Sequence, residues 1–200
     1  QLPAIVAPLW PARLRDLFVW FIVPCGGGQA RSVAPSLPRL SKGDIMQTLN
    51  IVGAGRLGQS VGRLAALAGY RIGSVYCRSL ASAQAACTFI GQGMPVAGLQ
   101  LLQPAELTLL AVPDARIAEV AAQLAATGSL AAGQVAFHAS GACEAALLVP
   151  LAVQGVYCAS LHPAFSFAEP ARAVASFAGT RCALEGDERT FACLQDLAIA

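Results

Sequence analysis

From residue 46 onward, short apolar segments alternate with longer segments that have helical periodicity. The short segments predict strands over 48–52, 72–77, 107–112, 134–139, 155–161 and 180–184, and the longer ones predict helices over 56–68, 79–90, 114–126 and 188–200. Gly91, Gly93 and Pro95 predict a loop. Residues 107–112 are almost uniformly apolar, as strands are when both faces of a parallel sheet are covered. The alternation therefore predicts an α/β domain with a parallel sheet and covering helices.

A glycine-rich turn joins the first predicted strand to the first predicted helix. Its sequence, Gly53-Ala54-Gly55-Arg56-Leu57-Gly58, has the Gly-x-Gly-x-x-Gly pattern of dinucleotide-binding loops. The first glycine allows a tight turn, the second lets a pyrophosphate approach the backbone, and the third lets the helix pack closely on the sheet. The free N–H groups of the helix N-terminus would then face the phosphates. This context predicts a Rossmann-type doubly wound sheet with a dinucleotide site; the alternative is a glycine-rich turn without a ligand.

The end of the second predicted strand bears on the choice of cofactor. An NAD site usually has an acidic residue here to bind the ribose hydroxyls, whereas this chain has Arg78 and Ser79. A guanidinium and a hydroxyl suit a 2′-phosphate, so NADP is predicted over NAD. The alternative is that Arg78 is solvated and Ser79 only caps the next helix. Arg56 either reaches phosphate or is merely exposed.

Both histidines of the chain follow predicted strands. His138 lies two residues before Ser140, and His162 precedes Pro163. Histidine exchanges a proton near neutral pH, as alcohol or imine redox chemistry requires, and a serine hydroxyl can hold a substrate oxygen. His162, Ser140 and His138 are therefore the candidate catalytic residues, although each histidine could instead satisfy backbone groups in a loop. Asp114 is interpreted as a helix cap rather than an acid catalyst.

Small apolar residues at the end of the predicted strand 107–112 would line the ribose and nicotinamide of a bound cofactor. The predicted cofactor-binding set is Gly53, Ala54, Gly55, Arg56, Leu57 and Gly58 in the loop, Arg78 and Ser79 after the second strand, and Ala111, Val112 and Pro113. No metal site is expected, because the seven cysteines lack the close spacing of zinc ligands. They are expected to be reduced and buried.

Composition and charge narrow the classes of partner. The 200 residues are 56% hydrophobic, which is enough for one domain with a buried core. Residues 46–200 carry eight arginines and nine acidic residues, so no basic patch suggests nucleic acid. No apolar run reaches the roughly 18 residues of a membrane span. We therefore expect a small-molecule substrate, no nucleic-acid or membrane partner, and a cytoplasmic location.

Residues 1–45 differ from the rest of the chain. They hold six of the 12 prolines and show no sustained periodicity, and Met46 lies just before the first predicted strand. We therefore predict that 46–200 is the dinucleotide-binding domain and that 1–45 is a non-native or upstream-translated segment. The last predicted helix is not clearly finished, so the domain is expected to be truncated at its C-terminal end.

Several motifs together resemble the Rossmann-like proteins that carry a domain of unknown function numbered 2520. They are Ile51–Gly58, then 111–114, the segment Phe137-His138-Ala139-Ser140-Gly141-Ala142, and Ser160-Leu161-His162-Pro163 with Ser166-Phe167. These proteins are similar to pyrroline-carboxylate reductase, the deazaflavin-dependent NADP reductases and 6-phosphogluconate dehydrogenase. The serine and His-Pro layout is also similar to that of prephenate-dehydrogenase-like enzymes, in which serine and histidine address the substrate hydroxyl. Unlike the 6-phosphogluconate and hydroxyisobutyrate dehydrogenases, this chain has no lysine after Lys42.

The resemblance implies an NADP-linked oxidoreductase that transfers hydride to or from a carbonyl, imine or alcohol. It also implies a C-terminal helical domain, missing here, that completes the substrate cleft and makes a homodimer. We therefore expect residues 46–200 to bind cofactor but to turn over poorly. The competing hypothesis is a non-catalytic dinucleotide-binding sensor or regulatory module, which needs only the glycine loop.

Overall fold

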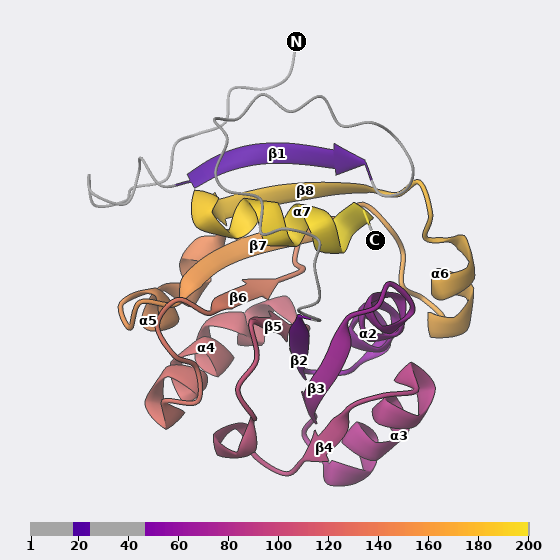
Figure 1. The fold of residues 1–200 in the computed structure, drawn as a ribbon, viewed down its shortest axis with the longest axis horizontal. Coiled ribbons are helices and arrows are strands. Elements are labelled where there is room, and N and C mark those ends of the chain that lie inside the picture. The colour runs from indigo at the N-terminus through magenta and orange to yellow at the C-terminus, as the bar shows by residue number, and fades with distance from the viewer. Residues whose placement is uncertain (1–17, 25–46, 200) are drawn as a thin grey trace.

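A computed structural model describes residues 18–24 and 47–199, and these form a single sheet with helices on both sides (Figure 1). The strands of the described residues lie in the order β1-β8-β7-β6-β5-β2-β3-β4. All neighbours from β7 to β4 are parallel. The parallel strands are β2 (Thr48–Val52), β3 (Arg71–Tyr76), β4 (Met94–Val96), β5 (Leu107–Leu110), β6 (Val135–His138) and β7 (Tyr157–Pro163).

The order of the parallel strands is that of a doubly wound Rossmann sheet, so the predicted fold class is confirmed. The chain runs outward from β2 through β3 to β4 and then crosses over to β5 on the other side of β2. This reversal makes a topological switch point between β2 and β5. Ligands of such sheets bind in the crevice beyond the carboxyl ends of the strands at that point.

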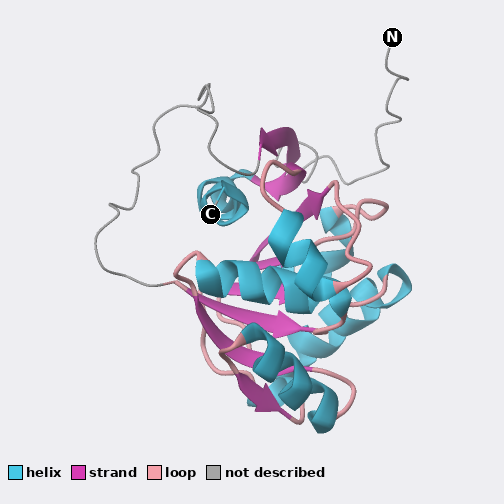
Figure 2. Ribbon diagram, turned by 90° about the vertical axis from the view of Figure 1, so that its right-hand side faces the viewer, coloured by secondary structure: helices cyan, strands magenta, loops and turns pink. Residues whose placement is uncertain are grey.

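Helices cover both faces of the sheet (Figures 1 and 2). Two apolar clusters, one on each face, bury the sheet between these helices. One face carries α2 (Arg56–Leu67), α3 (Leu80–Ile90), α6 (Pro170–Ser176) and α7 (Phe191–Ile199). The other carries α4 (Ile117–Thr127), α5 (Val149–Ala152) and the 3₁₀ turns η1 (Leu99–Leu101) and η3 (Ala145–Leu148).

Most predicted elements are present, but two local predictions are wrong and two short helices were not predicted. The expected loop around Gly93 contains the short strand β4, which pairs with β3 even though Pro95 lies within it. The helices α5 and α6 were not predicted, because each is short and begins near a proline. Asp114 begins the 3₁₀ turn η2 (Asp114–Arg116) and its side chain caps no helix.

The strand β8 (Arg181–Asp187) runs antiparallel to β7, which the strand–helix alternation did not reveal. The connection through α6 leaves the carboxyl end of β7 and rejoins the sheet at that same end. The strand β8 therefore runs in the opposite direction. The strand β1 (Phe18–Pro24) pairs antiparallel with β8 and comes from the segment expected to lie outside the domain. Whether residues 1–45 are natively translated remains a prediction, and the other residues before Gln47 lie outside the described ranges.

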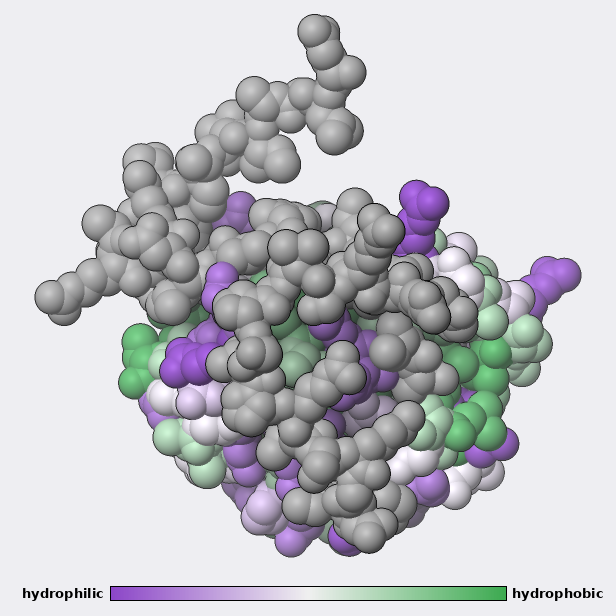
Figure 3. Space-filling model, turned by 45° about the horizontal axis from the view of Figure 1, so that its top comes forward, coloured by the Kyte–Doolittle hydropathy of each residue, from purple (hydrophilic) through white to green (hydrophobic). Residues whose placement is uncertain are grey.

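The surface of the described residues mixes polar and apolar side chains. Around the grey atoms in Figure 3, hydrophobic residues lie in small groups among hydrophilic ones. The large hydrophobic residues that are exposed belong to different elements: Leu67, Leu80, Met94, Leu101 and Val153. None of the helices in the described ranges is long and apolar enough to span a bilayer.

Candidate functional site

The first glycine of the loop makes the turn out of β2 possible. Gly53 has φ +91°, a conformation that side chains disfavour, and its N–H donates to the carbonyl of Tyr76 at 2.8 Å. A Cβ on Gly53 would lie 2.7 Å from the carbonyl oxygen of Ala111 and 2.7 Å from Cγ1 of Val112. The loop after β2 therefore lies directly against the residues that follow β5, at the switch point.

The other two glycines have opposite surroundings. A Cβ on Gly58 would overlap the carbonyl oxygen of Gly53, so α2 begins in direct contact with the turn. A Cβ on Gly55 would have no atom within 4 Å, and Gly55 is exposed. Gly55 is also the N-cap of α2, where no side chain caps the helix and no acidic residue lies in the first turn. The loop thus leaves open space beside uncapped N–H groups, which suits an anion.

Two of the residues after β3, Ser79 and Arg78, differ in their contacts with the rest of the described chain. The Ser79 hydroxyl accepts a hydrogen bond from the N–H of Ser82 at 3.2 Å, so its predicted capping of α3 is confirmed. Arg78 is exposed, and among the described residues no hydrogen bond or ion pair of its side chain is found. Its guanidinium is therefore available to a ligand at this edge of the sheet.

Cys77 contributes a contact that the sequence did not predict. Its sulfur accepts a hydrogen bond from the N–H of Ala54 at 3.4 Å, so the thiol holds the second residue of the glycine loop. A second internal bond runs from Nε2 of Gln59 to the carbonyl of Ala54 at 3.1 Å. Both bonds fix the loop from within, and neither uses the space beside Gly55.

The segment after β5 lies where the cofactor-lining residues were predicted. Ala111 and Val112 are half-buried and Pro113 is exposed. The N–H of Ala111 donates to the carbonyl of Val52 at 2.8 Å, which extends the β2–β5 pairing by one residue. Ala111 and Val112 lie directly against Gly53 at the switch point.

His138 is fully buried, and both of its ring nitrogens are occupied. Nδ1 accepts a hydrogen bond from the N–H of Ser140 at 3.2 Å. Nε2 therefore carries the proton and donates to the carbonyl of Glu144 at 3.1 Å. Burial lowers the pKa of His138 and keeps the imidazole neutral. This environment favours the alternative in which His138 satisfies backbone groups, so we do not assign it a proton-transfer role.

His162 occupies a different environment, in which one ring nitrogen has no hydrogen-bond partner among the described residues. Its Nδ1–H donates to the carbonyl of Ala139 at 3.2 Å, and in the neutral ring this tautomer makes Nε2 an acceptor. The ring packs against the backbone of Gly141, where a Cβ would overlap the imidazole. Ser140 is half-buried in the same loop, and its hydroxyl accepts from the N–H of Ala142 at 3.2 Å. The structure thus brings His162 and the Ser140 loop together.

Two buried polar residues beside His138 were missed by sequence reasoning. Ser160 is 5% exposed and donates from its hydroxyl to the carbonyl of Ser140 at 3.2 Å. Glu185 is 6% exposed and accepts from the N–H of Ala145 at 2.9 Å. Burial raises the pKa of Glu185, and the nearby charge of Glu144 adds to the rise. A single acid within the apolar run of β8 was the available signal, but the predicted strand stopped one residue short of it.

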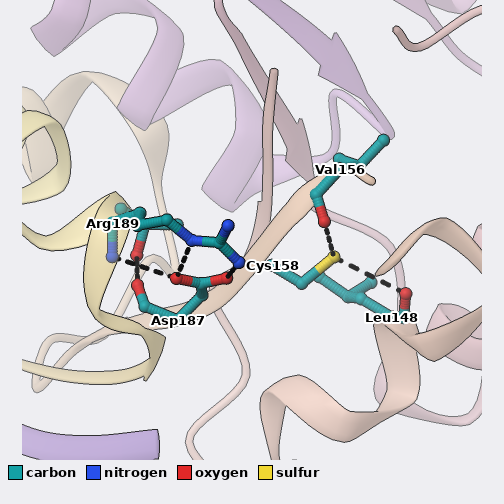
Figure 4. Close-up of polar contacts among 6 residues, drawn as sticks. Leu148, Val156, Cys158, Asp187 and Arg189 are labelled. Atoms are coloured by element: carbon teal, nitrogen blue, oxygen red, sulfur yellow. Dashed lines mark hydrogen bonds and ion pairs between the residues drawn. The ribbon is translucent and has the colours of Figure 1, made fainter. Parts of the chain in front are cut away.

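An ion pair secures the opposite end of the sheet, where β7 begins and β8 ends. The carboxylate of Asp187 accepts hydrogen bonds from the N–H and Nε of Arg189 at 3.0 and 2.9 Å (Figure 4). The same guanidinium lies over the ring of Tyr157, 3.9 Å from its centroid. These groups lie at the amino end of β7, whereas His162 lies near its carboxyl end. We assign them a structural role.

The cysteines of the described residues form neither a disulfide nor a metal site. No disulfide bond joins the six cysteines of the described residues, and no three His, Cys, Asp or Glu side chains in these ranges could hold a metal ion. The Cys158 thiol donates to the carbonyls of Leu148 and Val156 (Figure 4), and burial raises its pKa to about 12. Cys158 and Cys182 are buried as expected, whereas Cys77, Cys87, Cys143 and Cys193 are half-buried.

Known proteins share this architecture. The model of the Rossmann-like domain family matches residues 38–163, more than half of the chain. A protein of Bacteroides fragilis described as an NADP oxidoreductase is similar, with 20% identity and a TM-score of 0.52 over 60% of this chain and 45% of that chain. Arogenate dehydrogenase of Synechocystis is similar with 17% identity and a TM-score of 0.58, over 76% of this chain and 58% of the enzyme.

A pyrroline-5-carboxylate reductase of Coxiella burnetii is also similar, with 16% identity and a TM-score of 0.52, over 62% of this chain and 46% of the reductase. The chain thus spans about half the length of these proteins. No curated protein matches the sequence. At these levels of identity the likeness establishes the fold.

The environment of His138 predicts a pH dependence of stability. The unfolded chain takes up a proton near the ordinary pKa of 6.5, whereas burial keeps the folded imidazole neutral to lower pH. The free energy of unfolding should therefore fall as the pH drops below 6.5, by up to about 1.4 kcal/mol per pH unit, until the lowered pKa is reached. Denaturant titrations at a series of pH values measure this slope.

The matched variant is His138→Gln, which keeps a neutral donor and acceptor but cannot take up the proton. Glu185 titrates with the opposite sign, because its raised pKa makes the folded state gain a proton as the pH falls. Because both proteins retain Glu185, subtracting the slope of the variant from that of the wild type removes the contribution of Glu185. An identical slope in both proteins would show that His138 has the same pKa in the folded and unfolded states, which would contradict the buried and fully bonded environment described for it.

Proposed function

Because the chain belongs to the Rossmann-like domain family, we propose that it is the dinucleotide-binding part of a small-molecule oxidoreductase. The observation that carries the proposal is the open space at Gly55, beside the uncapped start of α2 and at the switch point of the sheet. A pyrophosphate placed there would accept hydrogen bonds from the first-turn N–H groups. It would occupy the volume that a side chain at Gly55 would fill.

NADP is the proposed cofactor, with NAD the less favoured one. Arg78 supports this preference, because an exposed guanidinium after the second parallel strand lies where a 2′-phosphate is bound in this fold. The Ser79 hydroxyl already accepts the capping bond of α3, which leaves Arg78 as the main phosphate partner. Arg56 is exposed at the start of α2 and would add a second cationic contact.

The bound nicotinamide would supply or accept hydride, and this chain would supply the groups around it. Ala111, Val112 and Pro113 would line the ribose and nicotinamide. Nε2 of His162 has no hydrogen-bond partner among the described residues and would exchange a proton with a substrate alcohol, carbonyl or imine. The Ser140 loop would lie beside the substrate oxygen.

The rest of the whole protein would complete this site. The His-x-Ser-Gly-Ala segment at 138–142 and the His-Pro segment at 162–163 support membership of the proteins that carry domain of unknown function 2520. Such a protein would add a C-terminal helical domain that closes the substrate cleft and forms a homodimer. Residues 46–200 alone are then expected to bind the cofactor and to turn over poorly.

Replacing Gly55 by alanine tests the dinucleotide site. The new Cβ meets no atom within 4 Å and the φ of −71° suits alanine, so stability should change by less than about 1 kcal/mol. The methyl group would fill the proposed pyrophosphate position, so NADPH affinity should fall by about ten-fold or more, or about 1.4 kcal/mol. Calorimetric titration and thermal unfolding measure the two effects.

The matched control is Gly58→Ala, whose Cβ overlaps the carbonyl oxygen of Gly53. That variant should lose both stability and NADPH binding, because the helix must move away from the turn. Wild-type affinity in Gly55→Ala would mean that the loop is a turn without a ligand. Absence of NADPH and NADH binding to the wild-type chain would contradict the proposal at this site in the same way.

Replacing Arg78 by alanine tests the choice of cofactor. Loss of the guanidinium should weaken NADPH binding by about ten-fold or more and leave NADH binding within about two-fold, because only NADPH carries the 2′-phosphate. The two affinities are measured by calorimetry on the same variant. Arg71→Ala is the control, since Arg71 is exposed at the opposite end of β3. Equal losses for both cofactors would remove Arg78 from the 2′-phosphate site.

Replacing His162 by glutamine in the whole protein separates an enzyme from a sensor. If His162 exchanges the substrate proton, kcat should fall by about 10²- to 10⁴-fold while the Kd for NADPH stays within about three-fold. The assay uses a carbonyl, imine or alcohol substrate found by screening the wild-type protein. Unchanged turnover would make His162 structural. A wild-type protein that binds NADPH and turns over no substrate would favour the sensor.

A further inference from the structure

We infer that His138, Ser160 and Glu185, here called the polar row, are positioning residues that hold the loop 139–145 against His162. The inference deepens the proposed function, because it assigns a purpose to three buried residues beneath the proposed proton-transfer site. Its structural part concerns only the ligand-free chain and can be tested without a substrate.

The polar row is a set of direct cross-strand neighbours. His138 in β6 is paired with Ser160 in β7, and Ser160 is paired with Glu185 in β8. Side chains at paired positions project to the same face of a sheet, so the three lie side by side on one face. All three are at most 6% exposed. Buried polar groups at these positions need hydrogen-bond partners, and here one loop supplies a partner to each.

The common partner is the backbone of the loop that follows β6. His138 bonds to both ends of that loop, through the N–H of Ser140 and the carbonyl of Glu144. Ser160 donates to the carbonyl of Ser140 at 3.2 Å, and Glu185 accepts from the N–H of Ala145 at 2.9 Å. Four backbone groups of one short loop are thus bonded to three side chains below it.

The loop in turn fixes the imidazole of His162. The carbonyl of Ala139 accepts a hydrogen bond from Nδ1–H, which selects the neutral tautomer with an unprotonated Nε2. The backbone of Gly141 packs against the ring and leaves no room for a side chain. A shift of the loop would therefore change both the position of the ring and the balance of its tautomers. The polar row acts on His162 through this loop, because His162 itself is paired with Ala183 in the next row.

Glu185 is the member whose presence is hardest to explain by packing alone. A buried carboxyl is costly, and burial raises its pKa. It accepts only one hydrogen bond from the described backbone, at the point where the loop enters η3. An apolar residue would fill the same volume without this cost, but it would leave the N–H of Ala145 without that partner. We therefore assign Glu185 to anchoring the far end of the loop.

The test compares Glu185→Ala, Glu185→Gln and Ser160→Ala by NMR of the ligand-free chain. Ring ¹⁵N shifts report the tautomers of the histidines, and the chain contains only two, His138 and His162. Glu185→Ala should raise the exchange rate of the Ala145 amide by about ten-fold or more and give His162 a mixture of tautomers. Glu185→Gln keeps an acceptor and should leave both signals as in wild type.

Ser160→Ala serves as a second route to the same answer if Glu185→Ala fails to fold. It removes only the bond to the carbonyl of Ser140, so it should shift the His162 tautomers in the same direction. Glu188→Ala is the control, because Glu188 is an exposed acid just after β8 and should change neither signal. Wild-type His162 shifts in folded Ser160→Ala and Glu185→Ala would overturn the inference, even with faster exchange at Ala145.

NADPH titration of the same variants separates this inference from the proposed function. The glycine loop follows β2, two strands away from β6, so affinities should stay within about three-fold of wild type. Loss of the His162 tautomer with no NADPH binding in any protein would support the polar row and contradict the cofactor site. Normal NADPH binding with unchanged His162 tautomers in the folded variants would support the cofactor site and contradict the role of the polar row.

Discussion

The contact between the backbone of Gly58 and the carbonyl of Gly53 sets the geometry on which the proposed cofactor site depends. It places the start of α2 directly on the turn that leaves β2. Because Gly53 in turn lies against Ala111, the same contact ties the helix to the end of β5. Gly55, the uncrowded glycine of the three in the loop, is then exposed beside uncapped N–H groups. Close packing below the loop thus produces the open space above it.

The face of the sheet beneath the Ser140 loop has two layers with different chemistry. In the lower layer, His138 and Glu185 are buried, and each is bonded to backbone groups. In the upper layer, one ring nitrogen of His162 has no backbone partner among the described residues. Two histidines on neighbouring parallel strands therefore have different hydrogen-bonding environments, because they lie at different depths.

The sequence predicted the elements that local chemistry determines. The strand β2, the glycine loop and the Ser79 cap follow from apolar runs, a spaced motif and a hydroxyl before a helix. It did not predict β4, because a three-residue strand with a central proline depends on a neighbour for its definition. The direction of β8 is likewise a property of the chain path. The environments of His138 and His162 differ in tertiary burial and in hydrogen bonding, which local sequence does not encode.

The polar row also has a consequence for how the sheet is assembled. Leu184 and Glu185 alternate across β8, so a shift of one residue in its pairing with β7 would exchange their faces. The carboxyl would then enter the apolar cluster that contains Leu194, and a leucine would lie beneath the loop backbone. Both errors carry a desolvation cost, which a strand with uniformly apolar residues would not impose. The same carboxyl that supports the loop therefore discriminates against misaligned strands during folding.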